Sequence, residues 1–98
     1  MSGNNKGSHN PTSQKHRNFV SEPMGNRSVR DVPGIGPVQG RRLEESGKPR
    51  ADQMMGDYLS TGRDQVQFQK NLKETSGANA KQQRDAHRGM KEWADNNI

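Results

Sequence analysis

The stretch Val32-Pro33-Gly34-Ile35-Gly36-Pro37-Val38-Gln39-Gly40-Arg41-Arg42-Leu43 decides the expected fold. Two glycines flank an isoleucine, and glycines allow a tight hairpin whose backbone can come close to a ligand. A proline suits the first turn of a helix, and the free N–H groups at a helix start favour phosphate. We therefore predict a helix-hairpin-helix element that binds phosphate, with Ile35 turned inward as an anchor. Gly40 would allow close packing one turn on, and Arg41 and Arg42 would reach toward a neighbouring phosphate.

Two other interpretations of this stretch are open. Its glycines follow the spacing G-x-G-x-x-x-G, whereas a dinucleotide-binding fold needs G-x-G-x-x-G after a strand. No strand pattern precedes the stretch, and 98 residues are too few for a doubly wound sheet. The second alternative interpretation is a simple Gly/Pro turn between two helices, without a ligand. The flanking prolines, the third glycine and the two arginines favour the phosphate-binding hairpin over both.

The rest of the chain carries helix signals on either side of the hairpin. Serine, aspartate or asparagine stands before several apolar patterns, glycine or proline follows them, and no segment alternates like a strand. The pattern predicts an all-α fold, a compact bundle of about five short helices that contains the helix-hairpin-helix. The expected segments are Ser13 to Ser21, a single turn from Ser28 to Val32, Val38 to Ser46, a helix between Pro49 and Gly62, Asp64 to Ser76, and a last helix capped by Asn79.

Composition alone favours less structure than these signals do. Only 24% of the 98 residues are hydrophobic and 4% aromatic, which is common in disordered chains. The caps and stops agree with one another along most of the chain, which is unusual in a disordered tract. We expect a disordered tail over residues 1–11 and one helical DNA-binding domain over residues 12–98. A largely disordered basic chain that binds DNA weakly is the alternative.

Charge indicates the class of partner. The net charge of +5 favours a polyanion, either nucleic acid or an anionic membrane surface. Without a long apolar run or a signal-peptide core, we expect a soluble intracellular protein. There is no cysteine, and His9, His16 and His87 lack the spacing of metal ligands, so we expect solvated histidines and no metal. No nucleophile–base pair is evident, so we expect no enzyme, catalytic residue, cofactor or small-molecule substrate.

Several stretches together resemble the barrier-to-autointegration factor family of small chromatin proteins. The resemblance covers residues 12–98 without an evident gap, and its two most specific blocks are Ser13–Val20 and Gly77–Gln82. The matching residues are Thr12 to Val20, Glu22-Pro23-Met24-Gly25, Gly34-Ile35-Gly36, Leu43-Glu44-Glu45, Gly47, Thr75, Gly77-Ala78-Asn79-Ala80-Lys81-Gln82 and Glu92-Trp93.

The resemblance implies a homodimer in which each protomer grips one DNA duplex, so that the dimer bridges DNA segments. It implies a protein of the nucleus, chromatin and nuclear envelope, also present in the cytoplasm, with LEM-domain proteins of the inner nuclear membrane and lamins as partners. It implies phosphorylation at Thr12 and Ser13. With Ile35 added as the anchor of the hairpin, the expected DNA-binding residues are Gln14, Lys15, Gly34, Ile35, Gly36, Val38, Gly40, Arg42, Ala80, Lys81 and Arg84.

The chain departs from the family in its central region. Positions that are usually large and apolar read Lys48, Asp57, Ser60, Thr61, Gln67 and Asn71, and the chain ends Asn96-Asn97-Ile98 where the family has a bulkier aromatic ending. In the family, this region makes the dimer contact and the groove for LEM-domain proteins. The departures therefore predict that DNA contacts are kept better than partner contacts. A divergent paralogue with weakened dimerisation and reduced bridging, or one that only binds proteins, is the alternative function.

Overall fold

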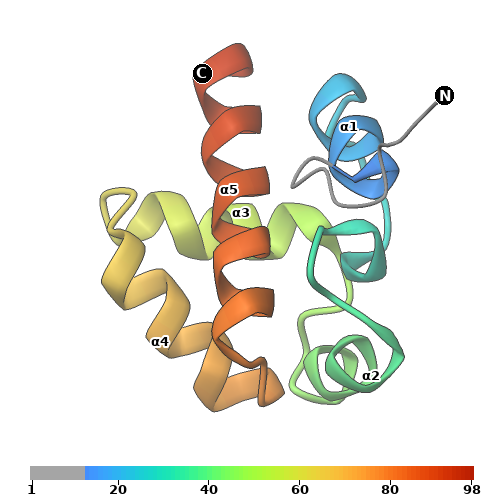
Figure 1. Cartoon of the computed structure of the whole chain (residues 1–98), viewed down its shortest axis with the longest axis vertical. Coiled ribbons are helices and arrows are strands. Elements are labelled where there is room, and N and C mark those ends of the chain that lie inside the picture. Colours follow the sequence, from blue (N-terminus) through green and yellow to red (C-terminus); the bar gives the residue numbers. More distant parts are fainter. Residues whose placement is uncertain (1–12) are drawn as a thin grey trace, which may run out of the picture.

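The structure is a computed structural model that describes residues 13–98; the predicted tail over residues 1–11 and Thr12 lie outside the described residues. The described part forms five α-helices and one 3-10 helix (Figure 1). This confirms the predicted all-α class, with bounds within two or three residues of those expected. The last helix, at 18 residues, is longer than the short helices predicted. The elements are α1 (Gln14–Ser21), η2 (Val29–Asp31), α2 (Pro37–Glu45), α3 (Ala51–Ser60), α4 (Gln65–Ser76) and α5 (Ala80–Asn97).

The helix ends form where the sequence supplies caps. Ser13 Oγ accepts a hydrogen bond from the His16 backbone N–H at 3.1 Å and so caps α1. Asn79 and Gln82 form a reciprocal capping box at the start of α5. Gly77 ends α4 with φ of 74°, a left-handed conformation that glycine adopts without steric cost.

Helix α5 is the central element of the fold. It packs against α1 on one side and α4 on the other, and α3 crosses behind it (Figure 1). Helix α2 packs against α4 and η2. The chain between η2 and α2 lies close to the first turn of α5. The fold thereby brings the starts of α2 and α5 together at one end of the molecule.

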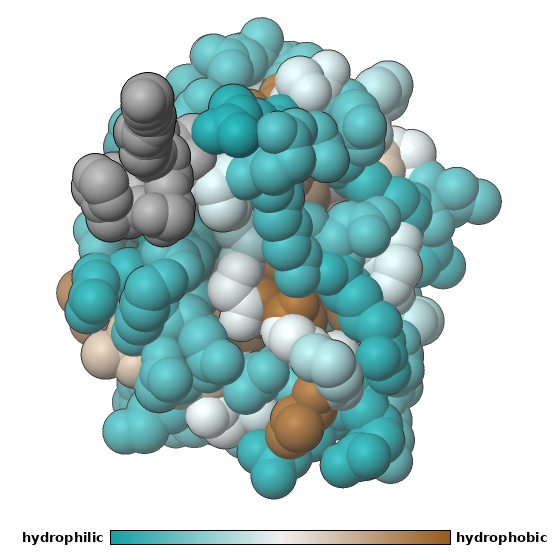
Figure 2. All heavy atoms as spheres, turned by 45° about the vertical axis from the view of Figure 1, so that its right-hand side comes forward, coloured by the Kyte–Doolittle hydropathy of each residue, from teal (hydrophilic) through white to brown (hydrophobic). Residues whose placement is uncertain are grey.

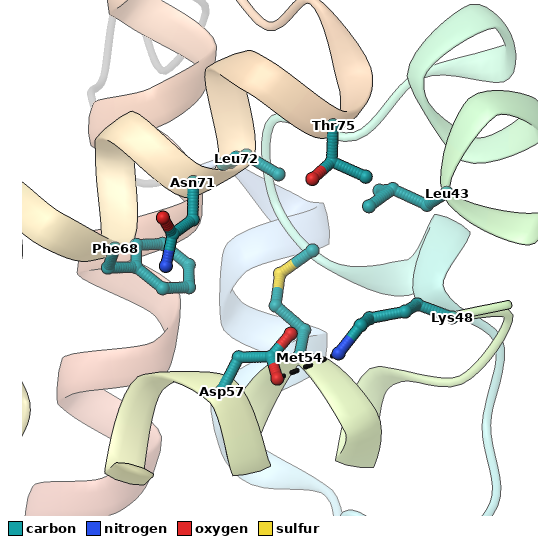
Figure 3. A pocket seen from close by; sticks show the side chains of 8 residues that line it. All are labelled: Leu43, Lys48, Met54, Asp57, Phe68, Asn71, Leu72 and Thr75. Atoms are coloured by element: carbon teal, nitrogen blue, oxygen red, sulfur yellow. Dashed lines mark hydrogen bonds and ion pairs between the residues drawn. The ribbon is translucent and has the colours of Figure 1, made fainter. Parts of the chain in front are cut away.

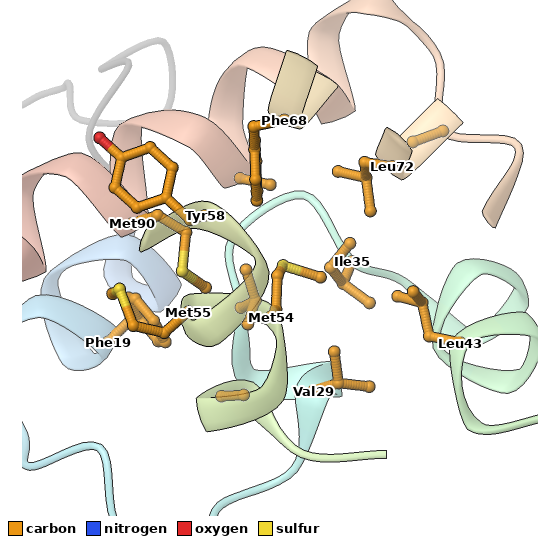
Figure 4. Close-up of a cluster of buried hydrophobic side chains, with 14 of the residues drawn as sticks. Phe19, Val29, Ile35, Leu43, Met54, Met55, Tyr58, Phe68, Leu72 and Met90 are labelled. Carbon is orange, nitrogen blue, oxygen red and sulfur yellow. The ribbon is translucent and has the colours of Figure 1, made fainter. Parts of the chain in front are cut away.

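A single apolar core joins these helices (Figure 4). Tyr58 and Phe68 meet edge to face with ring centroids 5.5 Å apart, and His87 packs against Tyr58 at 5.6 Å. Each large apolar side chain buried in this way contributes roughly 1.5–3 kcal/mol. The larger core residues are Phe19, Val29, Val32, Ile35, Leu43, Met54, Met55, Tyr58, Phe68, Leu72 and Met90.

The prediction of solvated histidines is wrong for two of the three. His16 is 3% exposed, and its Nε2 lies 2.9 Å from Glu92 Oε1, so it links α1 to α5. His87 is 8% exposed within the aromatic cluster. Both occupy helix positions that face the core, and the polar residue type concealed this in the sequence. His9 lies outside the described residues.

Between residues 13 and 98, none of the helices combines the length and the apolar character that crossing a membrane requires.

Candidate nucleic-acid interface

The hairpin, residues 32–37, is anchored from below and pressed against α5. Val32 and Ile35 are buried, and the Ile35 N–H donates to the Val32 carbonyl at 3.1 Å. Gly34 has φ of +85°, and a Cβ atom at this position would lie 2.5 Å from the backbone carbonyl of Gln82. Glycine is therefore needed at position 34 for two reasons: the backbone is left-handed, and it comes close to the first turn of α5.

Helix α1 is tied to the same hairpin. Lys15 Nζ donates to the Ile35 carbonyl oxygen at 2.6 Å. Burial lowers the pKa of Lys15 from its ordinary value, and the nearby Asp31 carboxylate raises it in partial compensation. One N–H of this ammonium group is used inside the protein, so Lys15 holds α1 against the hairpin in addition to supplying charge.

The starts of α2 and α5 are joined by side-chain amides. Gln39 Nε2 donates to Gln82 Oε1 at 3.3 Å, and the same Oε1 accepts from the Asn79 backbone N–H at 2.8 Å. The starts of α2 and α5 are therefore adjacent, and the start of α1, which lies farther along α5 beside Glu92, reaches the hairpin through Lys15. We name this the hairpin surface; it comprises Gln14, Lys15, residues 34–38, Ala80, Lys81 and Arg84.

The three helix starts differ in how they are capped. Ser13 caps α1 and Asn79 caps α5, each with a side-chain oxygen. Helix α2 follows Gly36, which offers no side chain, and its first residue, Pro37, has no N–H. The next N–H groups, on Val38 and Gln39, belong to the orphan donors of a helix start. An oxygen of a phosphate is a suitable acceptor for them.

The expected DNA-binding residues are accessible to different degrees. Seven of them are exposed and two glycines are partly buried. The exposed ones are Gln14, Lys15, Val38, Arg42, Ala80, Lys81 and Arg84, and the partly buried ones are Gly34 and Gly36. Figure 2, which turns the right-hand side of Figure 1 forward, shows a predominantly hydrophilic face with small hydrophobic patches.

Two of the expected DNA-binding residues are buried. Ile35 is 1% exposed, as an anchor should be, so its side chain cannot touch a ligand. Gly40 lies under Arg30, where an added Cβ would be 2.6 Å from Arg30 Cγ. Its role is close packing, and direct contact with DNA at Gly40 would require Arg30 to move.

The expected cations also differ in what holds them. Arg42 Nη1 donates to the Ser76 carbonyl at 3.2 Å and so ties α2 to the end of α4. Lys81 pairs with Asp85 at 2.8 Å, yet its side chain remains 76% exposed. Arg84 is exposed and stands near the start of α5. Lys81 and Arg84 are therefore more available to a ligand than Arg42.

Sequence reasoning missed three contributors to this surface: Gln39, Gln82 and Arg30. Asn79 is the N-cap of α5 and Gln82 is its third residue. This capping-box spacing is visible in the sequence and could have indicated that Gln82 helps to form the start of the helix. Arg30 covers Gly40 and makes two hydrogen bonds to the Glu44 carboxylate, at 2.8 and 2.9 Å. No sequence signal identified that pair, because it joins η2 to α2 across the hairpin.

Apart from the hairpin surface, the molecule has a hollow between α2, α3 and α4 (Figure 3). We name it the α3–α4 hollow; it has a volume of about 40 Å³. Lys48 Nζ donates to Asp57 Oδ1 at 2.8 Å across its edge. Four apolar side chains from the core form its floor and four polar ones its rim. The lining residues are Leu43, Lys48, Met54, Asp57, Phe68, Asn71, Leu72 and Thr75.

Most of the polar departures noted in the sequence gather here. Lys48, Asp57 and Asn71 line the hollow, and Ser60 and Thr61 line an adjoining depression with Glu74. Residues separated in the sequence by as many as 23 positions thus share one part of the surface.

Comparison with known proteins gives consistent matches along the chain. The family model described as "Barrier to autointegration factor" matches residues 10–97. Barrier-to-autointegration factor B of Xenopus laevis is 50% identical over 84 residues, covering 86% of this chain and 93% of the relative. The Homo sapiens protein is 49% identical, with 86% and 94% covered. The Drosophila melanogaster protein is 43% identical, with 86% and 93% covered.

Proposed function

The chain belongs to the barrier-to-autointegration factor family, and on that premise we propose that it grips the backbone of double-stranded DNA without reading its sequence. The family is one of DNA-binding chromatin proteins, which supports a nuclear, architectural role and does not suggest an enzyme. The function proposed is to hold duplexes and, as a dimer, to bridge them.

One observation carries the proposal: the starts of α1, α2 and α5 all lie around the hairpin, each within reach of it. Each start presents the positive end of a helix dipole, and the uncapped start of α2 adds free N–H groups. Lys81 and Arg84 add exposed positive charge beside them. Contacts of this kind bind phosphate groups and fix the position of the protein on the duplex. Sequence-specific proteins instead contact the edges of the bases in the grooves. We therefore expect binding that is indifferent to sequence.

The remaining features follow from the family as proposals. We propose a homodimer of residues 12–98, located in the nucleus, chromatin and nuclear envelope and also in the cytoplasm, with LEM-domain proteins and lamins as partners. We propose phosphorylation at Ser13 and Thr12. Ser13 is exposed, and its hydroxyl caps α1 immediately before Gln14 and Lys15.

A second candidate function is a weakly dimerising paralogue that binds DNA but bridges it poorly. Seven sizeable apolar residues remain in the central region. Five of them are buried in the core of the protomer: Met54, Met55, Tyr58, Phe68 and Leu72. Only Leu59, at 38%, and Val66, at 77%, are exposed among those seven. Two exposed apolar side chains offer little area to offset the 4–15 kcal/mol, roughly, that association costs.

Gly36→Glu tests the proposed function. An added Cβ at Gly36 would meet the flexible end of Gln39 at 3.3 Å, so the fold should tolerate a side chain. The glutamate would block the start of α2 and repel phosphate. We expect duplex affinity to fall at least tenfold in a fluorescence titration, with helical content by circular dichroism unchanged.

Gln65→Glu is the matched control, since it alters charge by the same amount at an exposed residue at the start of α4. It should change affinity less than about threefold. Alanine at Lys15, Arg42, Lys81 or Arg84 should weaken all duplexes equally and lower the salt slope by up to about 0.9 each. Unchanged affinity in Gly36→Glu would remove the hairpin from the binding site.

A further inference from the structure

The outer face of α5 carries cations well beyond the hairpin surface. Lys81, Arg84, Arg88 and Lys91 follow one another at helical spacing, so they line one side of the 18-residue helix. All four residues are exposed. At about 1.5 Å per residue they stand roughly 4.5–6 Å apart and span roughly 15 Å along the axis.

The acids on this face do not balance its cations, because each is shared. Asp85 lies 2.8 Å from Lys81 Nζ and 4.0 Å from Arg88 Nη1. Asp95 pairs with Lys91 at 2.9 Å and also with Arg63. Glu92, one turn beyond Arg88, lies 2.9 Å from His16. With three carboxylates against five cations, the face keeps a surplus of positive charge.

Arg63 reaches this face from the loop between α3 and α4 by an uncommon backbone conformation. Its φ is 63°, in the left-handed region that costs a residue with a side chain free energy. Its guanidinium donates to Tyr58 Oη at 3.3 Å, to the Lys91 carbonyl at 3.5 Å and to Asp95. The fold thus holds a fifth cation at the far end of the row.

We propose that this row, which we name the α5 stripe (Lys81, Arg84, Arg88, Lys91 and Arg63), is a second nucleic-acid surface that binds the phosphate backbone. The inference rests on the proposed function, because its first two residues belong to the hairpin surface. A row of evenly spaced cations suits a polymer whose charges recur every 3.4 Å or so along each strand. A single small anion would instead need cations that converge on one point.

Continuity decides between DNA and an acidic protein as the occupant. Lys81 and Arg84 are shared with the hairpin surface, so a nucleic-acid backbone held there, or a second segment of it, meets Arg88 and Lys91 next. The stripe therefore lengthens the contact of one protomer with nucleic acid without any need for a dimer.

The test compares two double variants that each remove two positive charges. Arg88→Gln with Lys91→Gln alters the stripe, and Lys70→Gln with Lys73→Gln alters exposed lysines on α4. Binding of a labelled duplex of about 20 base pairs is measured between about 50 and 200 mM salt. The stripe variant should lose roughly ten- to a hundredfold in affinity and up to about 1.8 in salt slope, and the α4 variant less than about threefold.

Arg88→Lys with Lys91→Arg keeps the charge and should bind like the natural sequence. Equal behaviour of the stripe and α4 variants, while Gly36→Glu abolishes binding, would overturn the stripe alone. A natural sequence that binds no duplex would overturn the proposed function and the stripe together. Poly-glutamate is the second probe: a stripe variant that loses poly-glutamate but keeps its duplex affinity would assign the stripe to an acidic protein and overturn the inference.

Discussion

The hairpin surface and the α3–α4 hollow share only helix α2, and they depend on different parts of their residues. The hairpin surface relies on the backbone: a left-handed Gly34, an uncapped helix start and the Ile35 carbonyl, which accepts a hydrogen bond from Lys15. The hollow relies on side chains, with Lys48 and Asp57 paired over an apolar floor.

This difference explains how a chain with 24% hydrophobic residues can keep one surface and alter the other. Backbone N–H groups and close glycine packing survive most substitutions nearby, because they need little from neighbouring side chains. An apolar interface loses its driving force when its side chains become polar, since that force scales with buried apolar area. The hairpin surface should therefore tolerate surface change better than the hollow, and fail mainly when its glycines are replaced.

The largest expected effect comes from Gly34→Ala. The methyl group would meet the Gln82 carbonyl at 2.5 Å, and φ of +85° adds left-handed strain. Gly47 is the matched control, with φ of +89° and nothing within 4 Å of its added Cβ. We expect Gly47→Ala to lower the free energy of unfolding by about 1–2 kcal/mol, from strain alone. Gly34→Ala should cost about 1–3 kcal/mol more, since overpacking adds to strain.

Urea unfolding followed by circular dichroism measures both variants. Equal losses at the two positions would mean that the hairpin does not press on α5, and the contrast between backbone and side-chain dependence would fail.

Self-association is the next effect in size. The second candidate function, a weakly dimerising protein, predicts that the natural sequence is mainly monomeric at low micromolar concentration. Ser60→Val with Gln67→Leu should extend the apolar area beside Leu59 and Val66 and raise self-association at least tenfold, since burying a large apolar side chain contributes roughly 1.5–3 kcal/mol.

Sedimentation equilibrium measures the change, with and without a duplex. Asn18→Leu with Ser21→Val places similar groups on exposed positions of α1 and serves as the control. A natural sequence that is already a tight dimer and captures two duplexes would restore the full bridging mechanism and show that the polar rim does not weaken the interface.

The helices could be predicted well from the sequence because residues within one turn of each helix end determine where the helix begins and ends. Ser13, Asn79 and Gly77 act on residues within one turn, and the structure confirms all three. Asp64 and Gln67 have the spacing of a capping box, but only half of it forms: Asp64 caps α4, whereas the Gln67 side chain donates to Asn71.

Contacts between distant residues could not be predicted in this way. The bond from Lys15 to the Ile35 carbonyl and the link between Gln39 and Gln82 depend on how helices pack. The burial of His16 and His87 has the same origin, since a helix face was needed to show it. The hairpin was recognisable because glycine spacing is local, whereas the gathering of three helix starts around it was not.

Ser13→Asp sharpens the comparison on the hairpin surface. Aspartate keeps a cap for α1, and its charge would stand beside the proposed phosphates, as a phosphate on Ser13 would with about −1.5 to −2 charges. Ser13→Asn keeps the cap without the charge. We expect duplex affinity to fall roughly five- to tenfold in Ser13→Asp and less than twofold in Ser13→Asn. Equal affinity in the two variants, titrated at low salt, would remove electrostatic repulsion as the mechanism of such a switch.

Acid probes the packing of α5 against α3 and α4 through His87, which lies against Tyr58 and Phe68. Burial lowers the pKa of His87 below its ordinary 6.5, and Lys91 and Arg63 lower it further. In the folded protein His87 therefore stays neutral to a lower pH than in the unfolded chain, which binds a proton as the pH falls below about 6.5. The free energy of unfolding should thus be independent of His87 above pH 6.5 and decline below it, by about 1.4 kcal/mol for each unit by which the pKa is lowered.

Unfolding in urea at about pH 7.5 and 5.5 measures this decline. His87→Leu should lack it, although its stability at neutral pH differs as well. The pKa values of Glu44 and Asp95 are lowered by hydrogen bonds from their cationic partners, so their stabilising effect persists to more acid pH and is lost only below their ordinary values of 4.5 and 3.8. A decline that is identical in His87→Leu between those two pH values would assign it to another group.

The smallest expected effect is the ion pair of the hollow. Lys48 and Asp57 are 42% and 44% exposed and share a single hydrogen bond, so a double-mutant cycle with Lys48→Met and Asp57→Asn should give a coupling of about 0.2–1 kcal/mol. Near 1 M salt, where the screening length is about 3 Å, the coupling should shrink further. The Arg30–Glu44 pair beside the hairpin is bidentate and covers Gly40, so its coupling should be the larger of the two. Side-chain pairing at the hollow would then be nearly dispensable for the fold. A coupling above about 2 kcal/mol would instead make the polar rim an integral part of the protomer and end the contrast between the two regions.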